Sequence, residues 1–206
     1  MALARDRQLR VRKDNPIVYL DIKIGERGAG RLTIELRADV VPKTAENFRR
    51  LCTGETKHPE TGKRRHYAQC PVHRVIKDRF CQSGDYLNHD GSGGECVVDS
   101  GEDDNAPELV TTIEDRRVTF EDENFILRHT GPGVLSMVNT GPDSNASQFY
   151  LHFAPNAAFD NKHVVFGSLL GSESMGVLRE IHAVATERGD PKQPVKISGS
   201  GQLYPV

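Results

Sequence analysis

The residues best suited to chemistry lie in two stretches of the chain. In the stretch 131–167, Asn139, Gln148 and His163 each lie at or beside the end of an apolar run, where a side chain is held stiffly and can face a ligand. A lone polar residue at such a place is more often a structural group whose hydrogen bonds are satisfied. Three of them in one stretch, with a second polar segment upstream, favour a functional site instead.

The second stretch, 72–86, adds a cation and a further amide. Arg74 lies in the middle of an expected strand, and Phe80 and Gln82 lie in the next extended piece. The apolar runs that position these residues are separated by loops rich in Gly, Pro, Asn, Asp and Ser, as in neighbouring strands of a β-barrel or sandwich. The three apolar runs of the downstream stretch are 134–138, 148–153 and 164–166.

Alternation of apolar and polar residues predicts a hairpin nearer the N-terminus. The pattern occupies 16–24 and 31–37, on either side of a glycine-rich turn at 25–30. It indicates two antiparallel strands with one buried face. The residues expected on that face are Val18, Leu20, Ile22, Ile24, Leu32, Ile34 and Leu36.

Two helices are also expected. Pro42 suits the first turn of a helix, because its missing N–H would have no partner there. The second helix would be capped by Ser172 or Ser174. The apolar face of the first helix would comprise Ala45, Phe48, Leu51 and Cys52. The apolar face of the second would comprise Met175, Leu178 and Ile181, with Arg179 and Glu180 toward solvent. After the second helix, a closing strand is expected at 195–197.

Five motifs in this order carry a family resemblance. They are VPKTAENFRRLCTGE (41–55), HRVI followed by FCQSGD (73–85), FEDENFILRHTGPGVLSMVNTGP (120–142), SQFYLHF (147–153) and DNKHVVFG (160–167). Over residues 16–203 the chain resembles the cyclophilins, the peptidyl-prolyl cis-trans isomerase family. The resemblance implies a mainly β fold, a closed eight-stranded antiparallel β-barrel capped by two α-helices, with a filled interior and a binding groove on its outer face.

The resemblance also implies roles for individual residues. Rotation about an X–Pro bond meets a barrier of about 20 kcal/mol, because the amide nitrogen shares its lone pair with the carbonyl. A guanidinium that donates toward the proline nitrogen lowers this barrier without proton transfer. Arg74 would do this, Gln82 would orient Arg74 and grip the substrate backbone, and Asn139 would hold the residue before proline. The substrate-binding residues would be Phe80, Val138, Thr140, Gln148, Tyr150, Phe159, His163 and Gly91. No metal ion, nucleotide or other cofactor is expected.

The chain departs from the family pattern near the expected pocket. Where the family usually has Phe-Met-Cys, this chain has Arg79, Phe80 and Cys81, so Phe80 would have to replace the pocket phenylalanine. Ala158 stands where many members have a tryptophan that touches cyclosporin, which predicts weak cyclosporin binding. Val138 and Thr140 replace smaller alanines and would tighten the groove.

Composition limits the partners and the compartment. The net charge of −2 and the pI near 6.4 argue against nucleic acid and membrane surfaces as partners, and no apolar run is long enough to cross a bilayer. Four cysteines without a C-x-x-C pair suit reduced thiols in the cytoplasm. A zinc site built on Cys70, His66 and His73 is disfavoured, because no fourth ligand has suitable spacing. We expect a monomer that acts on proline-containing peptides and client proteins.

The domain prediction is a basic, disordered tail at 1–14 followed by one domain at 15–206. A nuclear or organellar address in the tail is the alternative. Insertions are expected near 55–71, as in the divergent-loop subgroup of the family, and near 95–119, where the added residues are acidic. Cys52 matches a redox-linked cysteine of that subgroup, but Ser200 replaces its partner, which favours an inert buried thiol.

Three functions other than that of an isomerase are alternatives for this sequence. A proline-peptide binding module with weak turnover would follow if Arg79 disables the pocket, whereas retention of Arg74 and Gln82 favours an enzyme. A serine hydrolase is disfavoured because Ser92, in its glycine turn, lacks a strand-turn-helix elbow. A redox-regulated chaperone would depend on Cys52 alone.

Overall fold

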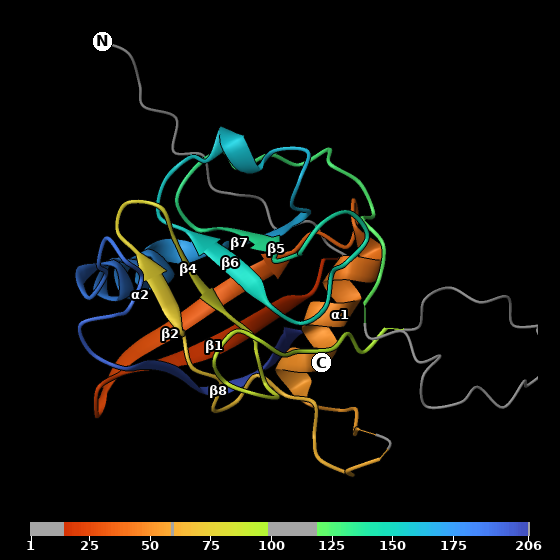
Figure 1. Ribbon diagram of the computed structural model, residues 1–206, viewed down its shortest axis with the longest axis horizontal. Coiled ribbons are helices and arrows are strands. Elements are labelled where there is room, and N and C mark those ends of the chain that lie inside the picture. The colour runs from red at the N-terminus through yellow and green to blue at the C-terminus, as the bar shows by residue number, and fades with distance from the viewer. Residues whose placement is uncertain (1–14, 59, 99–118, 206) are drawn as a thin grey trace, which may run out of the picture.

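The computed structural model describes residues 15–58, 60–98 and 119–205. Eight strands form one antiparallel sheet in the order β3-β4-β6-β5-β7-β2-β1-β8, and two α-helices pack on it (Figure 1). The elements are β1 (Ile17–Ile24), β2 (Arg27–Leu36), α1 (Pro42–Thr53), β3 (Arg74–Ile76), β4 (Phe80–Ser83), β5 (Val134–Met137), β6 (Phe149–His152), the 3-10 helix η2 (Ala157–Phe159), β7 (Val165–Leu169), α2 (Gly171–Ala183) and β8 (Val195–Tyr204). The mainly β fold with an eight-stranded antiparallel sheet and two α-helices is therefore confirmed.

The sheet has two ends, and this limits what is shown of the expected closed barrel. β3 and β8 are the terminal strands of the ladder and do not pair with each other. The residues just before β3 do reach β8, because Val72 N–H donates to Val195 O at 2.8 Å and Ile197 N–H donates to Cys70 O at 2.9 Å. The observed structure is thus a strongly curved sheet whose two ends approach through the segment before β3.

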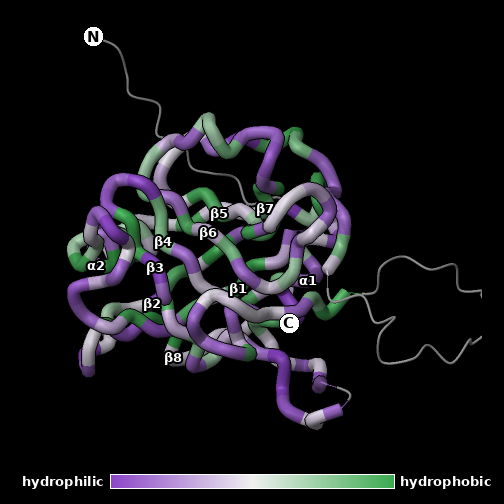
Figure 2. Tube along the Cα trace, in the orientation of Figure 1, coloured by the Kyte–Doolittle hydropathy of each residue, from purple (hydrophilic) through white to green (hydrophobic). Residues whose placement is uncertain are grey.

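The N-terminal hairpin follows the predicted alternation. Every residue expected on its buried face is at most 5% exposed. The predicted turn at 25–30 was too long, since β1 ends at Ile24 and β2 begins at Arg27. Gly25 adopts a left-handed φ of 56°, which lets the chain reverse at once. Gly28 and Gly30 belong to β2 and pair with β1. Figure 2 shows hydrophobic segments along the strands and hydrophilic ones in the peripheral loops.

Helix α1 begins at Pro42 as predicted, and its expected apolar face is fully buried. Its first turn is held by Glu123, whose carboxylate accepts hydrogen bonds from the N–H groups of Lys43 and Thr44 at 3.0 and 2.9 Å. These N–H groups have no partner within the helix, so a distant acid serves as the cap.

The predicted serine cap of α2 was wrong. The N-cap residue is Leu170, and no side chain caps this end. Ser174 is buried inside the helix, and its Oγ accepts a hydrogen bond from Thr33 N–H at 2.9 Å. This serine therefore joins α2 to β2. Among the residues predicted for the core face, Leu178 and Ile181 are buried, whereas Met175 is half-buried.

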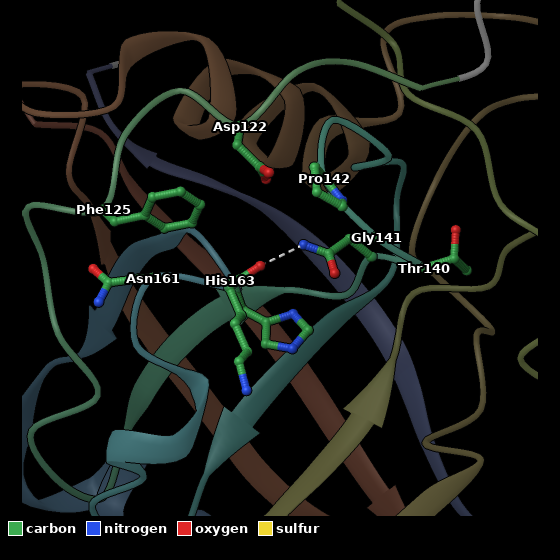
Figure 3. Close-up of a pocket in the computed structure, with 9 residues that line it drawn as sticks. Asp122, Phe125, Thr140, Gly141, Pro142, Asn161 and His163 are labelled. Carbon is green, nitrogen blue, oxygen red and sulfur yellow. Dashed lines mark hydrogen bonds between the residues drawn. The ribbon is translucent and has the colours of Figure 1, made fainter.

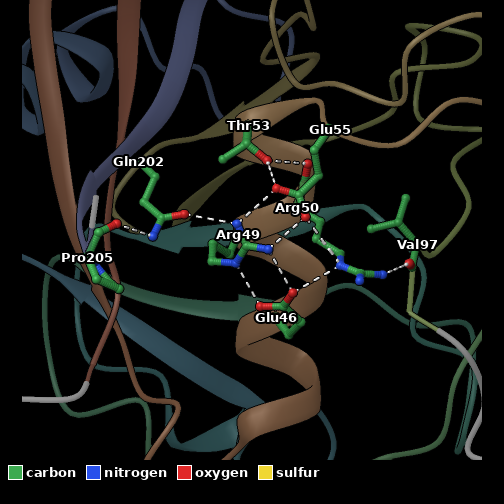
Figure 4. A network of polar contacts seen from close by, with 8 residues as sticks. All are labelled: Glu46, Arg49, Arg50, Thr53, Glu55, Val97, Gln202 and Pro205. Carbon is green, nitrogen blue, oxygen red and sulfur yellow. Dashed lines mark hydrogen bonds and ion pairs between the residues drawn. The ribbon is translucent and has the colours of Figure 1, made fainter.

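A polar network ties α1 to the end of the chain (Figure 4). Arg49 contacts the carboxylates of Glu46 and Glu55 at 2.7 and 2.8 Å, and its Nη1 donates to Gln202 Oε1 at 2.9 Å. The bond to Glu46, followed by the bond to Glu55, raises the pKa of Arg49 above its usual value. The network joins the helix to β8, the terminal strand of the sheet.

The first predicted insertion is an ordered hairpin in its described residues. Its arms are joined by Arg65 N–H to Thr56 O at 3.0 Å and His58 N–H to Lys63 O at 2.8 Å. Most of the second predicted insertion, including the acidic residues in its middle, and the tail at 1–14 lie outside the described residues. The single-domain assignment stays a prediction. No helix in the described part of the chain is long and apolar enough to cross a membrane.

Candidate active site

The outer face of β3, β4, β6 and β5 carries a second apolar cluster, separate from the main core. Side chains in a strand alternate between the two faces of a sheet. Val75, Cys81 and Leu151 therefore belong to the main core. Ile76, Phe80 and Tyr150 form the outer cluster, with Val138 and Phe159 packed against it.

Three aromatic rings contact one another in this outer cluster. The ring centroid of Phe80 lies 4.6 Å from that of Tyr150 and 5.4 Å from that of Phe159, and the last two are 5.2 Å apart. Such tilted and edge-to-face ring pairs contribute about 0.5–1.5 kcal/mol each beyond their buried area. Phe80 is only 3% exposed, so its ring lies beneath its neighbours, at the place where the family resemblance predicts the binding groove. The rings make a firm apolar surface of a kind that suits a proline ring.

His163 borders this surface. Its ring centroid lies 4.6 Å from Phe159 and 5.4 Å from Tyr150. The Nδ1 atom is 3.1 Å from Met137 O, and a carbonyl can only accept, so Nδ1 carries the proton and Nε2 is left as an acceptor. Burial lowers the pKa of His163 from 6.5. The imidazole is therefore neutral near pH 7.

Arg74 places a positive charge next to this aromatic cluster. It stands opposite Gln82 in the β3–β4 ladder, and its Cζ lies 5.9 Å from the centroid of Phe80. The backbone of Gly189 lies against the aliphatic part of the Arg74 side chain, since a Cβ at Gly189 would come within 2.9 Å of Arg74 Cγ. No carboxylate among the described residues forms an ion pair with Arg74. The guanidinium of Arg74 is exposed and can be reached from solvent.

A chain of side-chain amides leads from Gln82, which stands opposite Arg74, to the glycine loop, the GSGG segment at 91–94. Gln82 Nε2 donates to Gln148 Oε1 at 2.8 Å. Gln148 Nε2 in turn donates to Gly91 O at 2.9 Å and to Gly93 O at 2.7 Å. Each amide is fixed by the next, which determines the way each one faces. Asp85 holds the same loop through its buried carboxylate, which accepts five backbone N–H groups.

Asn139 and Thr140 lie beside the groove and line a neighbouring pocket of about 490 Å³ (Figure 3). Asn139 Nδ2 donates to Lys162 O at 2.7 Å. No hydrogen bond among the described residues uses the main-chain N–H or carbonyl of Asn139, so both are available to a peptide. His163 lines the same pocket, which therefore adjoins the aromatic groove and does not contain Arg74 or Gln82.

The structure brings most of the predicted site residues together. Phe80, Tyr150, Phe159 and Val138 share one cluster, and Arg74 lies over it. Among the remaining predicted residues, Gln82, Gln148 and Gly91 are joined to one another by hydrogen bonds, and His163 contacts Tyr150 and Phe159. Asn139 lines the same pocket as His163. Thr140 is exposed, and its N–H donates to Ser144 Oγ at 3.0 Å.

Sequence reasoning missed two buried histidines behind the groove. His152 is fully buried, and its ring contacts His129 at 4.8 Å and Phe159 at 5.5 Å. His152 Nε2 lies 3.1 Å from Ser136 Oγ, and His129 Nδ1 lies 2.8 Å from an oxygen of Asp160. Strand alternation contains the signal, because His152 follows Tyr150 by two residues and so shares its face.

The environment of Cys52 bears on the alternative of a redox-regulated protein. Cys52 is fully buried, and burial raises the pKa of its thiol well above the usual value. Ser200 Oγ donates to Cys52 O at 2.9 Å and also lies 3.0 Å from His66 Nε2. A thiol held in its protonated form is a poor nucleophile, which fits the inert reading of Cys52.

Comparison with known protein families identifies the class of protein to which this fold belongs. The family described as cyclophilin type peptidyl-prolyl cis-trans isomerase/CLD matches residues 19–202. The chain belongs to this family. It is 46% identical over 190 residues to the peptidyl-prolyl cis-trans isomerase CYP22 of Arabidopsis thaliana, covering 92% of this chain and 85% of that one. It is 44% identical over 191 residues to the peptidyl-prolyl cis-trans isomerase H of Rhizopus delemar, covering 92% and 96%.

Proposed function

We propose that the protein catalyses rotation about X–Pro bonds in peptides and client proteins, with Arg74 as its catalytic residue. One observation carries the proposal: the Arg74 guanidinium, without a carboxylate partner among the described residues, lies 5.9 Å from the centre of the buried Phe80 ring, which belongs to an apolar cluster separate from the main core. Membership of an isomerase family supports the activity.

The proposed mechanism uses hydrogen bonds alone. The proline ring rests on Phe80, Tyr150 and Phe159, which leaves the peptide bond beside Arg74. As the bond twists, its nitrogen recovers a lone pair and becomes a hydrogen-bond acceptor. A guanidinium already in place stabilises this twisted state more than either planar one, and that difference lowers the barrier.

The amides would hold the chain on both sides of the rotating bond. Gln82 uses its N–H to contact Gln148, so its Oε1 is available to a substrate N–H and to Arg74. Asn139 offers its main-chain groups to the residue before proline, while its side chain is tied to Lys162. Fixing one side of the bond allows the other side to turn.

The direct test is isomer exchange of a short X–Pro peptide by NMR, comparing the wild type with Arg74→Ala and Arg74→Lys. We expect kcat/KM to fall by at least a hundredfold in Arg74→Ala, about 3 kcal/mol of lost transition-state stabilisation, and less in Arg74→Lys. Peptide affinity should change little. An Arg74→Ala enzyme within threefold of wild type would overturn the role of Arg74.

A second candidate, a proline-peptide binding module with weak turnover, is favoured by one observation. The Cζ of Arg79 lies 5.7 Å from the centroid of Phe80 and so covers part of the groove floor. In the same experiment, a wild-type protein that binds the peptide without accelerating exchange would support this reading. Recovery of exchange in Arg79→Phe would then identify Arg79 as the cause.

Several further expectations join the proposal. The partners are proline-containing client segments, with no nucleic acid and no membrane, and the protein is a monomer of the cytoplasm that assists folding. Support comes from the near-neutral composition. Cyclosporin would bind weakly, because Ala158 is exposed beside Phe159 and offers only a methyl group to a large apolar ligand. Calorimetry tests this, and a low nanomolar dissociation constant would contradict it.

The sheet would also close into a barrel through the segment before β3. The support is the isolated bridge between Pro71 and Lys196 and the flanking backbone hydrogen bonds of Val72 and Ile197. In a closed barrel, the amide protons of Val72 and Ile197 would exchange with solvent as slowly as those of central strands. Exchange within minutes, while β1 and β2 stay protected, would argue for an open edge.

A further inference from the structure

Two arginines share one aromatic ring at the groove. The Cζ atoms of Arg74 and Arg79 lie 5.9 and 5.7 Å from the centroid of Phe80. Both side chains are exposed, whereas Phe80 beneath them is buried. Cation–π contact of this kind contributes modestly at exposed sites and leaves the N–H groups of each guanidinium directed to solvent. Two sets of charged donors therefore face any chain that enters the groove.

The acidic residues nearest in sequence do not neutralise this pair. Asp78 precedes Arg79, but its carboxylate contacts His182 at 3.0 Å. Glu187 instead lies 3.4 Å from Lys77. Within the described residues, neither arginine forms an ion pair. The rim of the groove thus has an excess of positive charge, although the chain as a whole has a net charge of −2.

The position of Arg79 is fixed by the backbone. Its N–H donates to Ile76 O at 3.2 Å, and its carbonyl accepts a hydrogen bond from Phe153 N–H at 2.9 Å. The residue closes the turn between β3 and β4, so its side chain starts from a rigid point at the edge of the aromatic floor. A guanidinium held so close to the ring of Phe80 is within reach of residues beside a bound proline, since an extended chain advances about 3.5 Å per residue.

The geometry points to a substrate preference: Arg79, together with Arg74, selects prolines that have an anionic side chain within two residues. This inference rests on the proposed isomerase function and names the substrate class of the same groove. Carboxylates and phosphates share the required chemistry, because each presents a planar or tripodal set of oxygens that a guanidinium binds through two parallel hydrogen bonds. Glutamate, aspartate and phosphoserine are the side chains that supply it.

The test compares peptides that differ only at the residue beside proline. Ala-Pro, Lys-Pro, Glu-Pro and phosphoserine-Pro peptides, and the same substitutions one residue after proline, are measured by NMR exchange with wild type, Arg79→Gln and Arg27→Gln. Arg27 pairs with Glu180 on α2, so its variant removes the same charge at a site away from the groove. For wild type we expect kcat/KM on the better anionic peptide to exceed that on the lysine peptide by about tenfold at 50 mM salt, with a smaller ratio at 500 mM.

The ratio between anionic and cationic peptides decides the outcome. We expect Arg79→Gln to reduce it to about twofold, whereas Arg27→Gln keeps it. Preference for phosphoserine alone supports the inference with phosphate as the source, and preference for glutamate as well extends it to carboxylates. A ratio of one in wild type, or an unchanged ratio in Arg79→Gln, overturns the inference. No exchange of the Ala-Pro peptide would instead overturn the isomerase function itself.

Discussion

Gln82 Nε2 donates a hydrogen bond to Gln148 Oε1 at 2.8 Å, and both side chains are only 8% exposed. The pair joins β4, which carries the groove floor, to the residue just before β6. Because both N–H protons of the Gln148 amide are donated to carbonyls of the glycine loop, Gln148 can interact with Gln82 only as an acceptor, through its Oε1. The orientation of Gln82 is therefore set, through Gln148, by the loop that contains Gly91 and Gly93.

Replacing Gln148 by glutamate should break this orientation. A carboxylate cannot donate, and it would lie against the carbonyls of Gly91 and Gly93 in a buried position. We expect Gln148→Glu to lose about 2–4 kcal/mol of unfolding free energy in urea and at least tenfold in kcat/KM. The exposed Gln193→Glu is the matched control and should change either quantity little. A Gln148→Glu protein as stable as wild type would show that the loop carbonyls do not depend on this amide.

A methyl group at Gly91 should disturb the same loop from its other side. Gly91 adopts φ +94°, and a Cβ there would lie 2.7 Å from Nε2 of the half-buried His73. We expect Gly91→Ala to cost about 1–3 kcal/mol of unfolding free energy. Both the left-handed backbone conformation and the close contact with His73 would destabilise the folded state of the variant. Gly28→Ala has open space around its Cβ and no positive φ, so its cost should stay below about 1 kcal/mol. Equal losses in the two variants would contradict this account.

Much of the fold was readable from the sequence because its signals are local. Alternation placed β1 and β2, and Pro42 marked the start of α1. The failures involve partners distant in the chain. Ser174 looked like a helix cap, but β2 passes close enough for Thr33 N–H to use its hydroxyl. A distant strand that offers a donor outweighs a local capping preference, and no local pattern reveals that strand.

The candidate site shows the same limit. The family motifs identified Arg74 and the aromatic residues. They did not decide whether Phe80 or Arg79 packs against Tyr150, because the family's pocket phenylalanine aligns with Arg79. Strand register decides it: Phe80 pairs with His152 on β6, which turns its ring toward Tyr150, while Arg79 ends the turn and stays exposed. Alternation places His152 on the same face of the sheet as Tyr150, but it does not reveal that other side chains cover His152 completely, and so the residue was overlooked.

Acid should destabilise the protein through His152. Burial, followed by the nearby His129 and His163, lowers the pKa of His152 from 6.5 to about 3. The unfolded chain therefore binds a proton below pH 6.5 that the folded protein rejects until about pH 3, so stability present above pH 6.5 is lost as the pH falls through this window. Between pH 7 and pH 4.5 the loss from this one residue is about 2.5 kcal/mol.

The measurement is urea unfolding at pH 7 and pH 4.5 for wild type, His152→Gln and His89→Gln. Glutamine does not titrate and still offers an amide to Ser136, so His152→Gln should lose about 2.5 kcal/mol less than wild type between the two pH values. His89 is exposed, and its variant should follow wild type. Identical pH dependence in all three proteins would mean that His152 is protonated or solvated in the folded state.

Replacing Arg49 should weaken the link between α1 and β8. Its side chain is 17% exposed and contacts two carboxylates and Gln202 at once, so its guanidinium belongs to a network and not to a single surface pair. We expect Arg49→Met, which keeps the length of the side chain, to lose about 1–2 kcal/mol of unfolding free energy at 50 mM NaCl. The loss should shrink at 500 mM NaCl, where the repulsion left between Glu46 and Glu55 is screened. Arg27→Met removes one exposed ion pair with Glu180 and should cost less than about 0.5 kcal/mol. If the two variants lose the same amount at both salt concentrations, the network adds nothing beyond an ordinary surface pair, and the attachment of β8 to α1 rests on apolar packing alone.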